Sequence, residues 1–356
     1  MLNYESVDPI ETAITESLKS KIISRPNPWV GAALVPKDCQ DDPKKWFLGH
    51  TQEFGKEHAE VVAIKAAGRA ALSSTLYVTL EPCSHYGKTG PCTKAIIDAK
   101  ISRVVVGIKD PDKNVNGSGI KVLRESGVTV DFFPDQDKLK IIKNLLPYLW
   151  HRVNGNPYFL LKMATTLDGI IATRSGDSKW VSGETSRKAV HFLRATSDAI
   201  VVGVATLKND DPELTVRYGY DKLIKKQPER IVFGEVLGSF KATPYLRYSG
   251  EVNKFCESFK DKDFQQVMIE GGSKVAYEFL RSNLLNQITV FMAPKIYGAN
   301  DGITMFSGIG TDLIADLKTG SFESVEQLGE DIRIDYLSDI TVKFIESILE
   351  KNRNEN

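Results

Sequence analysis

The first half of the chain alternates between short apolar runs and longer segments that carry apolar residues at helical spacing. Residues 9–23 open with the helical pattern and predict an amphipathic helix. Further helices are predicted over residues 58–72, 91–100, 118–126 and 136–153. The apolar runs predict strands at residues 30–36, 46–50, 75–80, 103–108 and 128–133. Because strands and helices alternate, the pattern favours a mostly parallel sheet covered by helices on both faces.

Residues 154–158 (Asn-Gly-Asn-Pro-Tyr) interrupt this pattern and predict a domain boundary. The second half then alternates again. It predicts helices at residues 185–195 and 273–283, and strands at residues 159–164, 198–205, 229–233, 265–270, 287–294 and 339–346. Residues 215–228 and 299–337 show the least regular pattern and are expected to form loops. We therefore expect one domain over residues 1–153 and a second over residues 154–356.

Length and composition agree with a two-domain globular protein. The chain has 356 residues, and domains usually have roughly 100–200. Basic and acidic residues are equal at 46 each, so no excess of cations favours nucleic acid as a partner. No apolar run approaches the ~18–20 residues that span a bilayer, the N-terminus lacks the pattern of a secretory signal, and four cysteines are too few for a disulfide framework. We expect a soluble, cytoplasmic protein without a membrane or nucleic-acid partner.

Residues 58–92 combine the side chains of a catalytic zinc site. His58 lies at the start of a predicted helix, Cys83 follows a predicted strand, and Cys92 comes shortly afterwards. One imidazole and two thiolates leave a fourth tetrahedral position for water, whose pKa bound zinc can bring to about 7. Glu60 is two residues from His58, so on a regular helix the two side chains do not share a face. That spacing suits a carboxylate that moves protons better than a fourth ligand.

Each of these features is common when taken alone. A His-x-Glu sequence on a helix is usually a surface pair, and an isolated Pro-Cys carries no information. In this order, at the junctions between strands and helices, they match the zinc deaminase signature of His-x-Glu followed by Pro-Cys and a second cysteine. The combination therefore predicts a zinc-dependent deaminase.

The eight residues between Cys83 and Cys92, together with Pro26-Asn27-Pro28 and His58-Ala59-Glu60, resemble the deaminase half of the bifunctional riboflavin-biosynthesis deaminase/reductases. The resemblance implies Zn²⁺ as a cofactor and Glu60 as the acid/base residue. It assigns the metal to His58, Cys83 and Cys92, and the substrate to Asn27, His85 and Lys88. One departure is that the family commonly has Gly-Tyr-His where this chain has Gly49-His50-Thr51. Either His50 has moved into the site or that substrate contact is missing.

The second half contains no G-x-G-x-x-G motif, but Glu270-Gly271-Gly272-Ser273 joins the end of a predicted strand to a predicted helix. Exposed amides at such a turn, with the helix N-terminus behind them, can bind phosphate. Most Gly-Gly turns of this kind are only tight turns. The turn therefore predicts a phosphate site only in combination with the motifs around it in the sequence.

The resemblance to the same family continues through the second half. It rests on Lys162-x-Ala164, Leu167-Asp168-Gly169, Ser178-x-Trp180, Leu193-Arg194-Ala195 and residues 206–217, so that it spans residues 10–350. It implies a reductase that uses NADPH. The residues that it assigns to NADPH are Ala164, Trp180, Thr206, Asp210, Glu270, Gly271, Gly272 and Ser273. Those that it assigns to the substrate are Ser178, Arg194, Leu214, Arg217 and Glu270; the two arginines suit a phosphoribosyl group.

Taken together, the resemblance implies a fold class and a pair of reactions. The expected fold is α/β, with an N-terminal cytidine-deaminase-like three-layer α/β/α domain and a C-terminal dihydrofolate-reductase-like α/β domain. The first reaction is hydrolytic deamination of 2,5-diamino-6-(5-phosphoribosylamino)pyrimidin-4(3H)-one. The second is reduction of the ribosyl group of 5-amino-6-(5-phosphoribosylamino)uracil to ribityl. The expected partners are this small-molecule substrate and further copies of the chain, because the family forms dimers or tetramers.

Three alternatives remain open at this point. The reductase half departs from the family at Ile170, where an arginine is usual, and at Gly234-Glu235, where Asp-Ser is usual. An active deaminase with a degenerate or altered reductase domain would fit these departures. A nucleic-acid deaminase would use the same zinc residues. A purely structural zinc module would need a fourth protein ligand, for which Cys39 and Cys256 are the spare thiols.

Overall fold

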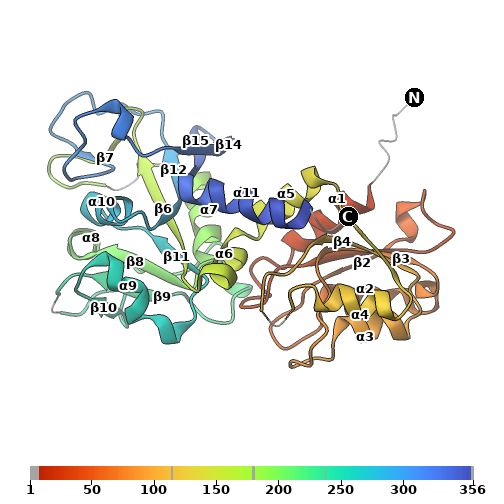
Figure 1. Cartoon of the computed structure of the whole chain (residues 1–356). Helices are drawn as coiled ribbons and strands as arrows, with labels where there is room; N and C mark the ends of the chain where they lie inside the picture. Colours follow the sequence, from red (N-terminus) through yellow and green to blue (C-terminus); the bar gives the residue numbers. More distant parts are fainter. Residues whose placement is uncertain (1–7, 114, 179–180, 237, 354–356) are drawn as a thin grey trace. The chain divides into compact units, whose positions relative to one another are not determined.

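The computed structural model describes residues 8–113, 115–178, 181–236 and 238–353 (Figure 1). Contacts between Cα atoms divide the chain into two units. Unit 1 comprises the chain up to Asn154 together with the segment from Ile345 onward, and unit 2 is Gly155–Phe344. The C-terminal segment differs from the sequence-based assignment, which places it in the second domain. It groups with unit 1 because the Asn352 carboxamide oxygen accepts the Lys109 amide (2.8 Å) and the Asn352 carbonyl accepts Lys138 Nζ (2.9 Å).

The sheet of unit 1 is mixed. Its strands lie in the order β2-β1-β3-β4-β5, and β3, β4 and β5 are parallel, whereas β1 is antiparallel to both of its neighbours. The strands are β1 (Gly31–Val35), β2 (Phe47–His50), β3 (Thr75–Leu80), β4 (Arg103–Ile108) and β5 (Thr129–Phe132). The expectation of a mostly parallel sheet is therefore wrong for its first edge. No α-helix lies between β1 and β2, and parallel neighbours need a long crossover connection, which is usually an α-helix.

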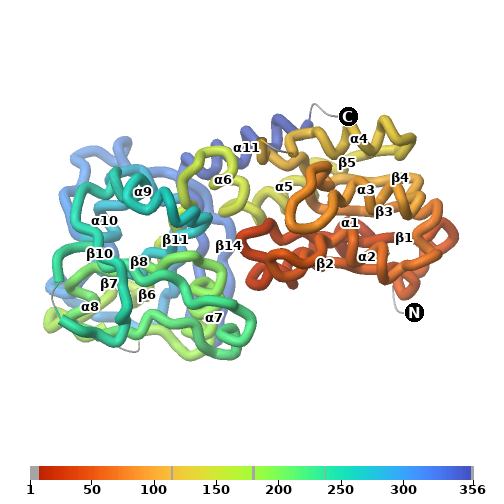
Figure 2. The backbone as a smooth tube through the Cα atoms, turned by 90° about the horizontal axis from the view of Figure 1, so that it is seen from below, coloured from red at the N-terminus to blue at the C-terminus, as the bar shows by residue number. Residues whose placement is uncertain are grey.

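Helices cover both faces of this sheet, which makes unit 1 a three-layer structure (Figures 1 and 2). One layer contains α1 (Pro9–Leu18) and α5 (Asp135–Asn144). The other contains α2 (Ala59–Ala67), α3 (Cys92–Asp98) and α4 (Ser118–Glu125), and α6 (Leu146–Asn154) follows α5. Gly49 of β2 lets α2 lie directly on the sheet, because a Cβ atom there would lie 2.1 Å from the Ala59 carbonyl oxygen. The layer of α2 and α3 carries the zinc residues.

Unit 2 is built on an eight-stranded sheet in the order β10-β9-β8-β11-β6-β12-β15-β14. All pairs from β10 to β12 are parallel, and β15 and β14 continue the sheet antiparallel. The strands are β6 (Tyr158–Thr165), β8 (Ala199–Gly203), β9 (Glu229–Phe233), β10 (Leu246–Tyr248), β11 (Gln266–Ile269), β12 (Leu285–Met292), β14 (Gly320–Leu328) and β15 (Asp331–Ser338). A separate two-stranded sheet pairs β7 (Ile170–Ala172) with β13 (Ile303–Thr304).

Alternate residues of the central strands of unit 2 enter cores on opposite faces, as the period-two geometry of a strand requires. On one face, Val201 and Val267 pack with Phe279 of α10 (Ser273–Arg281) and with α9 (Phe255–Ser258). On the other face, Val202 packs with Leu207 of α8 (Val204–Asp210), and a further cluster includes α7 (Glu184–Ala195). The sheet is thus covered by helices on both faces. Short 3-10 turns occur at Pro43–Lys45, Gly68–Ala71, Tyr220–Lys222, Val252–Lys254, Lys260–Lys262 and Ile314–Asp316.

The C-terminal elements correct two predictions. Residues 339–346, expected as a strand, begin helix α11 (Asp339–Arg353), and residues 299–337, expected as loops, contain β13, β14 and β15. The burial of β15 runs against its sequence pattern, since Asp331 and Asp335 are buried while Ile332 is 41% exposed. The Asp335 carboxylate is accommodated inside because it accepts the Thr289 hydroxyl (2.6 Å). No helix among the described residues has the length and apolar composition that crossing a membrane requires.

Candidate active sites

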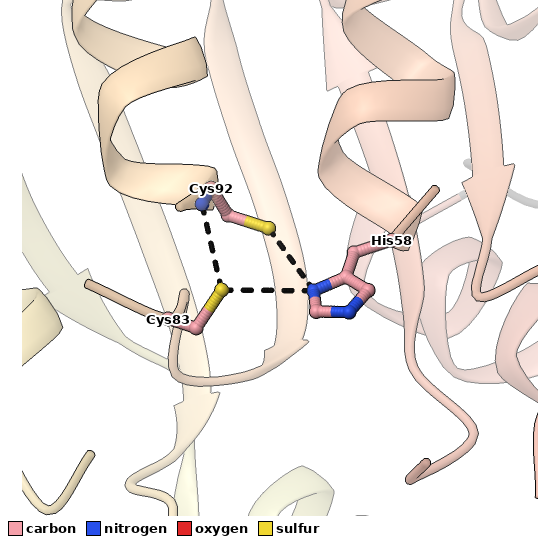
Figure 3. A group of neighbouring side chains, drawn as sticks. All are labelled: His58, Cys83 and Cys92. Carbon is pink, nitrogen blue, oxygen red and sulfur yellow. Dashed lines mark hydrogen bonds between the residues drawn. The ribbon is translucent and has the colours of Figure 1, made fainter. Parts of the chain in front are cut away.

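Three residues of unit 1 converge as the sequence predicts (Figure 3). His58 is the N-cap residue of α2, Cys83 lies three residues beyond the end of β3, and Cys92 is the first residue of α3. His58 Nδ1 lies 3.6 Å from Cys83 Sγ and 3.3 Å from Cys92 Sγ. The two helix starts and one strand end therefore direct an imidazole nitrogen and two sulfur atoms to one point.

The spacing of these atoms fits a zinc ion. Zn–S bonds of about 2.3 Å and Zn–N bonds of about 2.0–2.1 Å at tetrahedral angles separate sulfur from nitrogen by about 3.6 Å. Among the described residues, these three side chains are the one group of His, Cys, Asp or Glu residues whose ligand atoms lie close enough together to hold a metal ion. Neither Cys39 nor Cys256 belongs to it. A three-residue set of this composition is typical of a catalytic zinc site rather than a closed structural one.

The two thiols hold each other in different protonation states. A hydrogen bond from the Cys92 thiol lowers the pKa of Cys83 to about 4, and the same contact raises the pKa of Cys92. The Cys92 amide at the start of α3 also donates to Cys83 Sγ (3.5 Å). Cys83 is thus prepared as a thiolate, the form in which a cysteine binds metal.

Glu60 lies in the first turn of α2 and is 3% exposed. Burial raises the pKa of its carboxyl group to about 7. Because His58 has extended backbone angles and precedes the helix, both side chains reach the same cavity despite their two-residue spacing. A carboxyl group with a pKa near neutrality beside the metal ligands is suited to proton transfer.

The cavity around these residues has two lobes. An outer lobe of about 180 Å³ and an inner lobe of about 170 Å³ share Asn27, His58, Cys83 and His85. Lys56 and Lys88 line the outer lobe, so its charge is positive. The three residues that the resemblance assigns to the deaminase substrate, Asn27, His85 and Lys88, therefore all lie at this cavity.

The structure answers the question raised by Gly49-His50-Thr51. His50 points toward α1, where its Nδ1 atom lies 2.7 Å from the Glu16 carboxylate. Successive strand residues point to opposite faces, so Thr51 points the other way and lines the inner lobe. Its hydroxyl accepts the Val30 amide (3.1 Å). His50 has therefore not moved into the site.

The inner lobe also contains residues that the sequence analysis missed. They are Thr51, Glu81, Asp110, Asp112, Tyr148 and Arg152. The Glu81 carboxylate accepts amides of the loop after β4, including those of Gly117 and Gly119 (both 2.9 Å), and so fixes that loop beside Cys83. Glu81 lies within residues 58–92, directly before Pro82-Cys83. No spacing rule links the other five residues to that segment, since the fold alone brings them together.

Unit 2 has a second, larger cavity of about 610 Å³. It lies at the carboxyl ends of the parallel strands β6, β8, β9 and β11, where α/β sheets usually bind ligands. Gly271 allows the backbones to approach there, because a Cβ atom would lie 2.8 Å from the Gly203 nitrogen. The Gly272 amide donates to the Thr206 hydroxyl (3.0 Å) at the start of α10. The size and the glycine turn fit a dinucleotide whose phosphates face a helix N-terminus.

A buried ion pair crosses this cavity. The Arg194 guanidinium donates to both carboxylate oxygens of Glu270, at 2.5 Å and 2.8 Å, and to the Thr215 carbonyl at 2.9 Å. Burial alone would raise the pKa of Glu270, but Arg194 holds it below its usual value. Burial lowers the pKa of Lys162, which lines the same cavity. The floor of the cavity is therefore a charged and pre-oriented surface.

Most residues that the resemblance assigns to the reductase line this cavity. They are Ala164, Ser178, Arg194, Thr206, Asp210, Leu214, Glu270, Gly271, Gly272 and Ser273. The Ser178 hydroxyl donates to the Asp210 carboxylate (3.1 and 3.2 Å). Arg217 is placed differently, because its side chain is 54% exposed and pairs with Glu213 (2.8 Å). Trp180 lies outside the described residues.

The two sequence departures of this half do not reach the cavity. Ile170 is buried in β7 and packs against Gly302, and Glu235 is exposed beyond the end of β9. Neither is among the residues that line the cavity. The departures therefore lie outside the lining of this cavity, next to the lining residues Ile171 and Phe233.

Comparison with known proteins gives matches to both halves. Residues 7–108 match the cytidine and deoxycytidylate deaminase zinc-binding region, and residues 157–334 match the RibD C-terminal domain. The riboflavin biosynthesis protein RibD of Aquifex aeolicus is 36% identical over an alignment of 357 residues that covers 91% of this chain and 96% of that protein. RibD of Mycobacterium tuberculosis (strain H37Rv) is 34% identical over an alignment of 345 residues that covers 93% of this chain and 98% of that protein.

Solved structures agree over the same length. Acinetobacter baumannii RibD (form 1) superimposes with a TM-score of 0.83 at 29% identity, covering 93% of this chain and 98% of that one. The deaminase/reductase of Thermotoga maritima gives a TM-score of 0.80 at 29% identity, covering 93% and 97%. These matches confirm the predicted fold class, a cytidine-deaminase-like domain followed by a dihydrofolate-reductase-like α/β domain.

Proposed function

The chain belongs to the RibD family of bifunctional riboflavin-biosynthesis enzymes, and from this premise we propose which residues carry each of its two reactions. The protein is a zinc-dependent deaminase and an NADPH-dependent reductase. It removes an amino group from 2,5-diamino-6-(5-phosphoribosylamino)pyrimidin-4(3H)-one and then reduces the ribosyl group of the product to ribityl. We assign deamination to unit 1 and reduction to unit 2.

In unit 1, His58, Cys83 and Cys92 are assigned to the zinc ion and Glu60 to proton transfer. Zinc, when bound, supplies a water molecule that is acidic enough to act as a nucleophile at neutral pH. The Glu60 carboxylate would accept a proton from the nucleophilic water, and in its acid form it would donate a proton to the departing amine. Its burial and raised pKa suit both steps. The observation that carries the proposal is that His58, Cys83 and Cys92 form one cluster and that Glu60 lines the same lobe as His58 and Cys83.

The outer lobe is assigned to the phosphoribosyl end of the substrate. Lys88 and His85 lie at its mouth, where a dianionic phosphate meets positive charge. The Lys88 ammonium lies 4.0 Å from the centre of the Phe54 ring, which fixes its position. Asn27 is shared by both lobes, so it can hydrogen-bond the pyrimidine between phosphate and metal.

In unit 2, the Glu270–Ser273 turn, Ala164, Thr206 and Asp210 are assigned to NADPH, together with Trp180. The cofactor supplies the hydride when bound, and the protein supplies its position. Arg194, held by Glu270, orients the substrate together with Ser178 and Leu214. Leu214 has a φ of +53°, a conformation that leucine rarely adopts and that is common at ligand sites. Arg217 is assigned to the substrate phosphate at the exposed rim.

A second copy of the chain is the partner that we infer for unit 2. Strand β14 is the edge of the eight-stranded sheet, and its outward side chains include Phe322 (71% exposed) and Val325 (65% exposed). Their neighbours on β15, Tyr336 and Ile334, lie opposite them in register and extend the apolar face. A long edge strand with an apolar face is normally covered. A homo-oligomer, either a dimer or a tetramer, would cover it.

We also infer a cytoplasmic location. The substrate is a phosphorylated metabolite and NADPH is the reductant, and both are intracellular. The thiols at the metal site require reducing surroundings to stay free.

The zinc assignment is tested by comparing four cysteine variants. Cys83→Ser and Cys92→Ser are expected to lose zinc and ammonia release while keeping NADPH oxidation with pre-deaminated substrate. Cys39→Ser and Cys256→Ser are the matched controls and are expected to keep zinc and both activities. Zinc is counted by elemental analysis of the purified variants. Loss of zinc from either control would contradict the three-ligand site and support a structural one.

A further inference from the structure

Two side chains of helix α6, Tyr148 and Arg152, line the inner lobe. Neither belongs to the metal ligands or to the sequence motifs described above. We propose that Tyr148 and Arg152 of α6 are positioning residues of the deaminase, which hold the carboxylates of Asp110 and Asp112 as acceptors for the amino and ring N–H groups of the pyrimidine. This inference rests on the proposed deaminase function. It adds the part of the protein that recognises the base.

Tyr148 and Arg152 act together because they are four residues apart and share one face of α6. The Arg152 guanidinium lies 5.3 Å from the centre of the Tyr148 ring. Both side chains line the same lobe as His58 and Glu60. Helix α6 thus contributes directly to the cavity.

Tyr148 holds Asp110. Its phenol lies 2.9 Å and 3.1 Å from the two carboxylate oxygens of Asp110, and both residues are at least 95% buried. The Asp112 amide donates to one of the same oxygens (2.9 Å). Two donors fix the plane of the Asp110 carboxylate, so its remaining lone pairs have a defined direction.

Arg152 forms an ion pair with Asp112. Its Nε atom lies 3.4 Å from Asp112 Oδ2, and both side chains are partly exposed. Among the described residues that line the inner lobe, Arg152 is the one lysine or arginine. Together with Asp112, the same lobe of about 170 Å³ contains the carboxyl groups of Glu60, Glu81 and Asp110. The Arg152 guanidinium offsets the repulsion among these four groups.

The two lobes therefore differ in the chemistry that they recognise. The outer lobe offers Lys56 and Lys88 to an anion. The inner lobe offers carboxylate acceptors, and an aminopyrimidine presents N–H donors. A substrate that has a phosphate at one end and an amino-substituted ring at the other matches this division across the metal ligands.

The test uses Arg152→Met, Tyr148→Phe and Arg152→Lys in the full-length, zinc-loaded protein. Ammonia release is measured against concentration of the diaminopyrimidine substrate, and NADPH oxidation with pre-deaminated substrate serves as the internal control. Arg152→Met and Tyr148→Phe are expected to raise KM for ammonia release by roughly tenfold or more, with a smaller change in kcat. Arg152→Lys, which keeps the charge, is expected to recover part of that loss. Zinc content and NADPH oxidation are expected to stay unchanged. Arg69→Met, an exposed control outside the cavity, is expected to keep these and the KM for ammonia release.

A purely structural role for α6 predicts a different pattern. It would lower the melting temperature and reduce the amount of active enzyme, so that kcat falls while KM is unchanged. Unchanged KM in both Arg152→Met and Tyr148→Phe overturns the inference alone. Wild-type protein that releases no ammonia overturns the proposed function, and this inference with it.

Discussion

The two active sites are assembled in different ways. The zinc residues and Glu60 come from residues 58–92, at two helix starts and one strand end. The reductase cavity gathers residues from Lys162 to Ile303 along the carboxyl ends of four parallel strands. A metal imposes fixed distances on its ligands and so leaves a short sequence pattern. A long cofactor spreads its contacts over a sheet edge, and no single spacing records them.

The sites also differ in how they use buried charge. Unit 1 keeps a carboxyl group, Glu60, buried with its pKa near 7, so that it can exchange a proton. Unit 2 instead neutralises its buried carboxylate, because Arg194 binds Glu270 through two hydrogen bonds. The first arrangement favours proton transfer, and the second favours rigid orientation. Variants that affect one site and spare the other test this difference.

The largest effect is expected from Glu60→Gln. The amide keeps the shape of the side chain but cannot accept a proton, so ammonia release should fall by roughly 10²–10⁴-fold. Zinc content and NADPH oxidation with pre-deaminated substrate should be unchanged. Glu125→Gln on α4, whose side chain is 65% exposed, is the matched control. Deamination that survives Glu60→Gln would disprove the proton-transfer assignment.

Gly271→Ala should give the next largest effect and should be confined to unit 2. The new Cβ atom would lie 2.8 Å from the Gly203 nitrogen, so the strand ends must move apart. Overpacking of this kind costs about 1–3 kcal/mol, which predicts roughly 5- to 150-fold weaker NADPH binding. Titration of NADPH fluorescence measures it. Gly310→Ala is the matched control, because no atom lies within 4 Å of the added methyl group, and it should bind NADPH as the wild type does. Ammonia release should be unchanged in both variants.

Arg217→Ala should cause a smaller change, also in the reductase. The side chain is half-exposed and already pairs with Glu213, so its phosphate contact is screened by water. KM for the phosphoribosyl substrate should rise by roughly three- to tenfold without a change in kcat. Initial rates of NADPH oxidation against substrate concentration provide the value. A KM equal to that of the wild type would contradict the phosphate assignment and leave Arg217 only its surface ion pair with Glu213.

The smallest effect concerns acid stability of unit 2. The Asp168 carboxylate accepts the Gly298 amide, the Thr166 hydroxyl and the Tyr297 amide, and these hydrogen bonds lower its pKa to about 2. Because the folded pKa lies below the unfolded value, this carboxylate stabilises the fold above pH ~4 and loses that effect as pH falls toward 2.

Asp168→Asn should therefore lower the urea midpoint at pH 6 by a small amount and differ less from wild type at pH 3. Urea unfolding followed by circular dichroism at both values checks this. A difference that grows on acidification would reverse the sign and contradict the assignment.

Local patterns predicted most of the structure, and the failures have physical reasons. The alternating segments of unit 1 are found largely as predicted, and the three residues assigned to zinc lie together, because each of these patterns depends on neighbours in the sequence. Strand β15 was missed because its polar residues Asp331 and Asp335 are buried, against the usual pattern. The β-branched residues at the start of α11 predict a strand, but tertiary context makes them helical. Tyr148 and Arg152 reach the metal cavity only through the fold, so no spacing could reveal them.

The resemblance predicted the reductase cavity better than local patterns could. Thr206 and Gly272 are 66 residues apart, yet the hydroxyl of one accepts the amide of the other. The Gly-Gly turn alone indicated a phosphate site without saying what completes it. For His50 the resemblance was not sufficient, because it left open whether this histidine replaces the usual substrate contact. The structure shows that His50 contacts Glu16 instead.

The central claim is that one chain contains two independent active sites. The most direct measurement follows ammonia release and NADPH oxidation separately in one reaction, with zinc-loaded protein and the diaminopyrimidinone phosphoribosyl substrate. The account predicts that ammonia appears first and that NADPH is then consumed to the same final amount. Removal of zinc should abolish both signals with this substrate, but spare NADPH oxidation with pre-deaminated substrate. Ammonia release without any NADPH oxidation would contradict the account, because it would leave unit 2 without the assigned reaction.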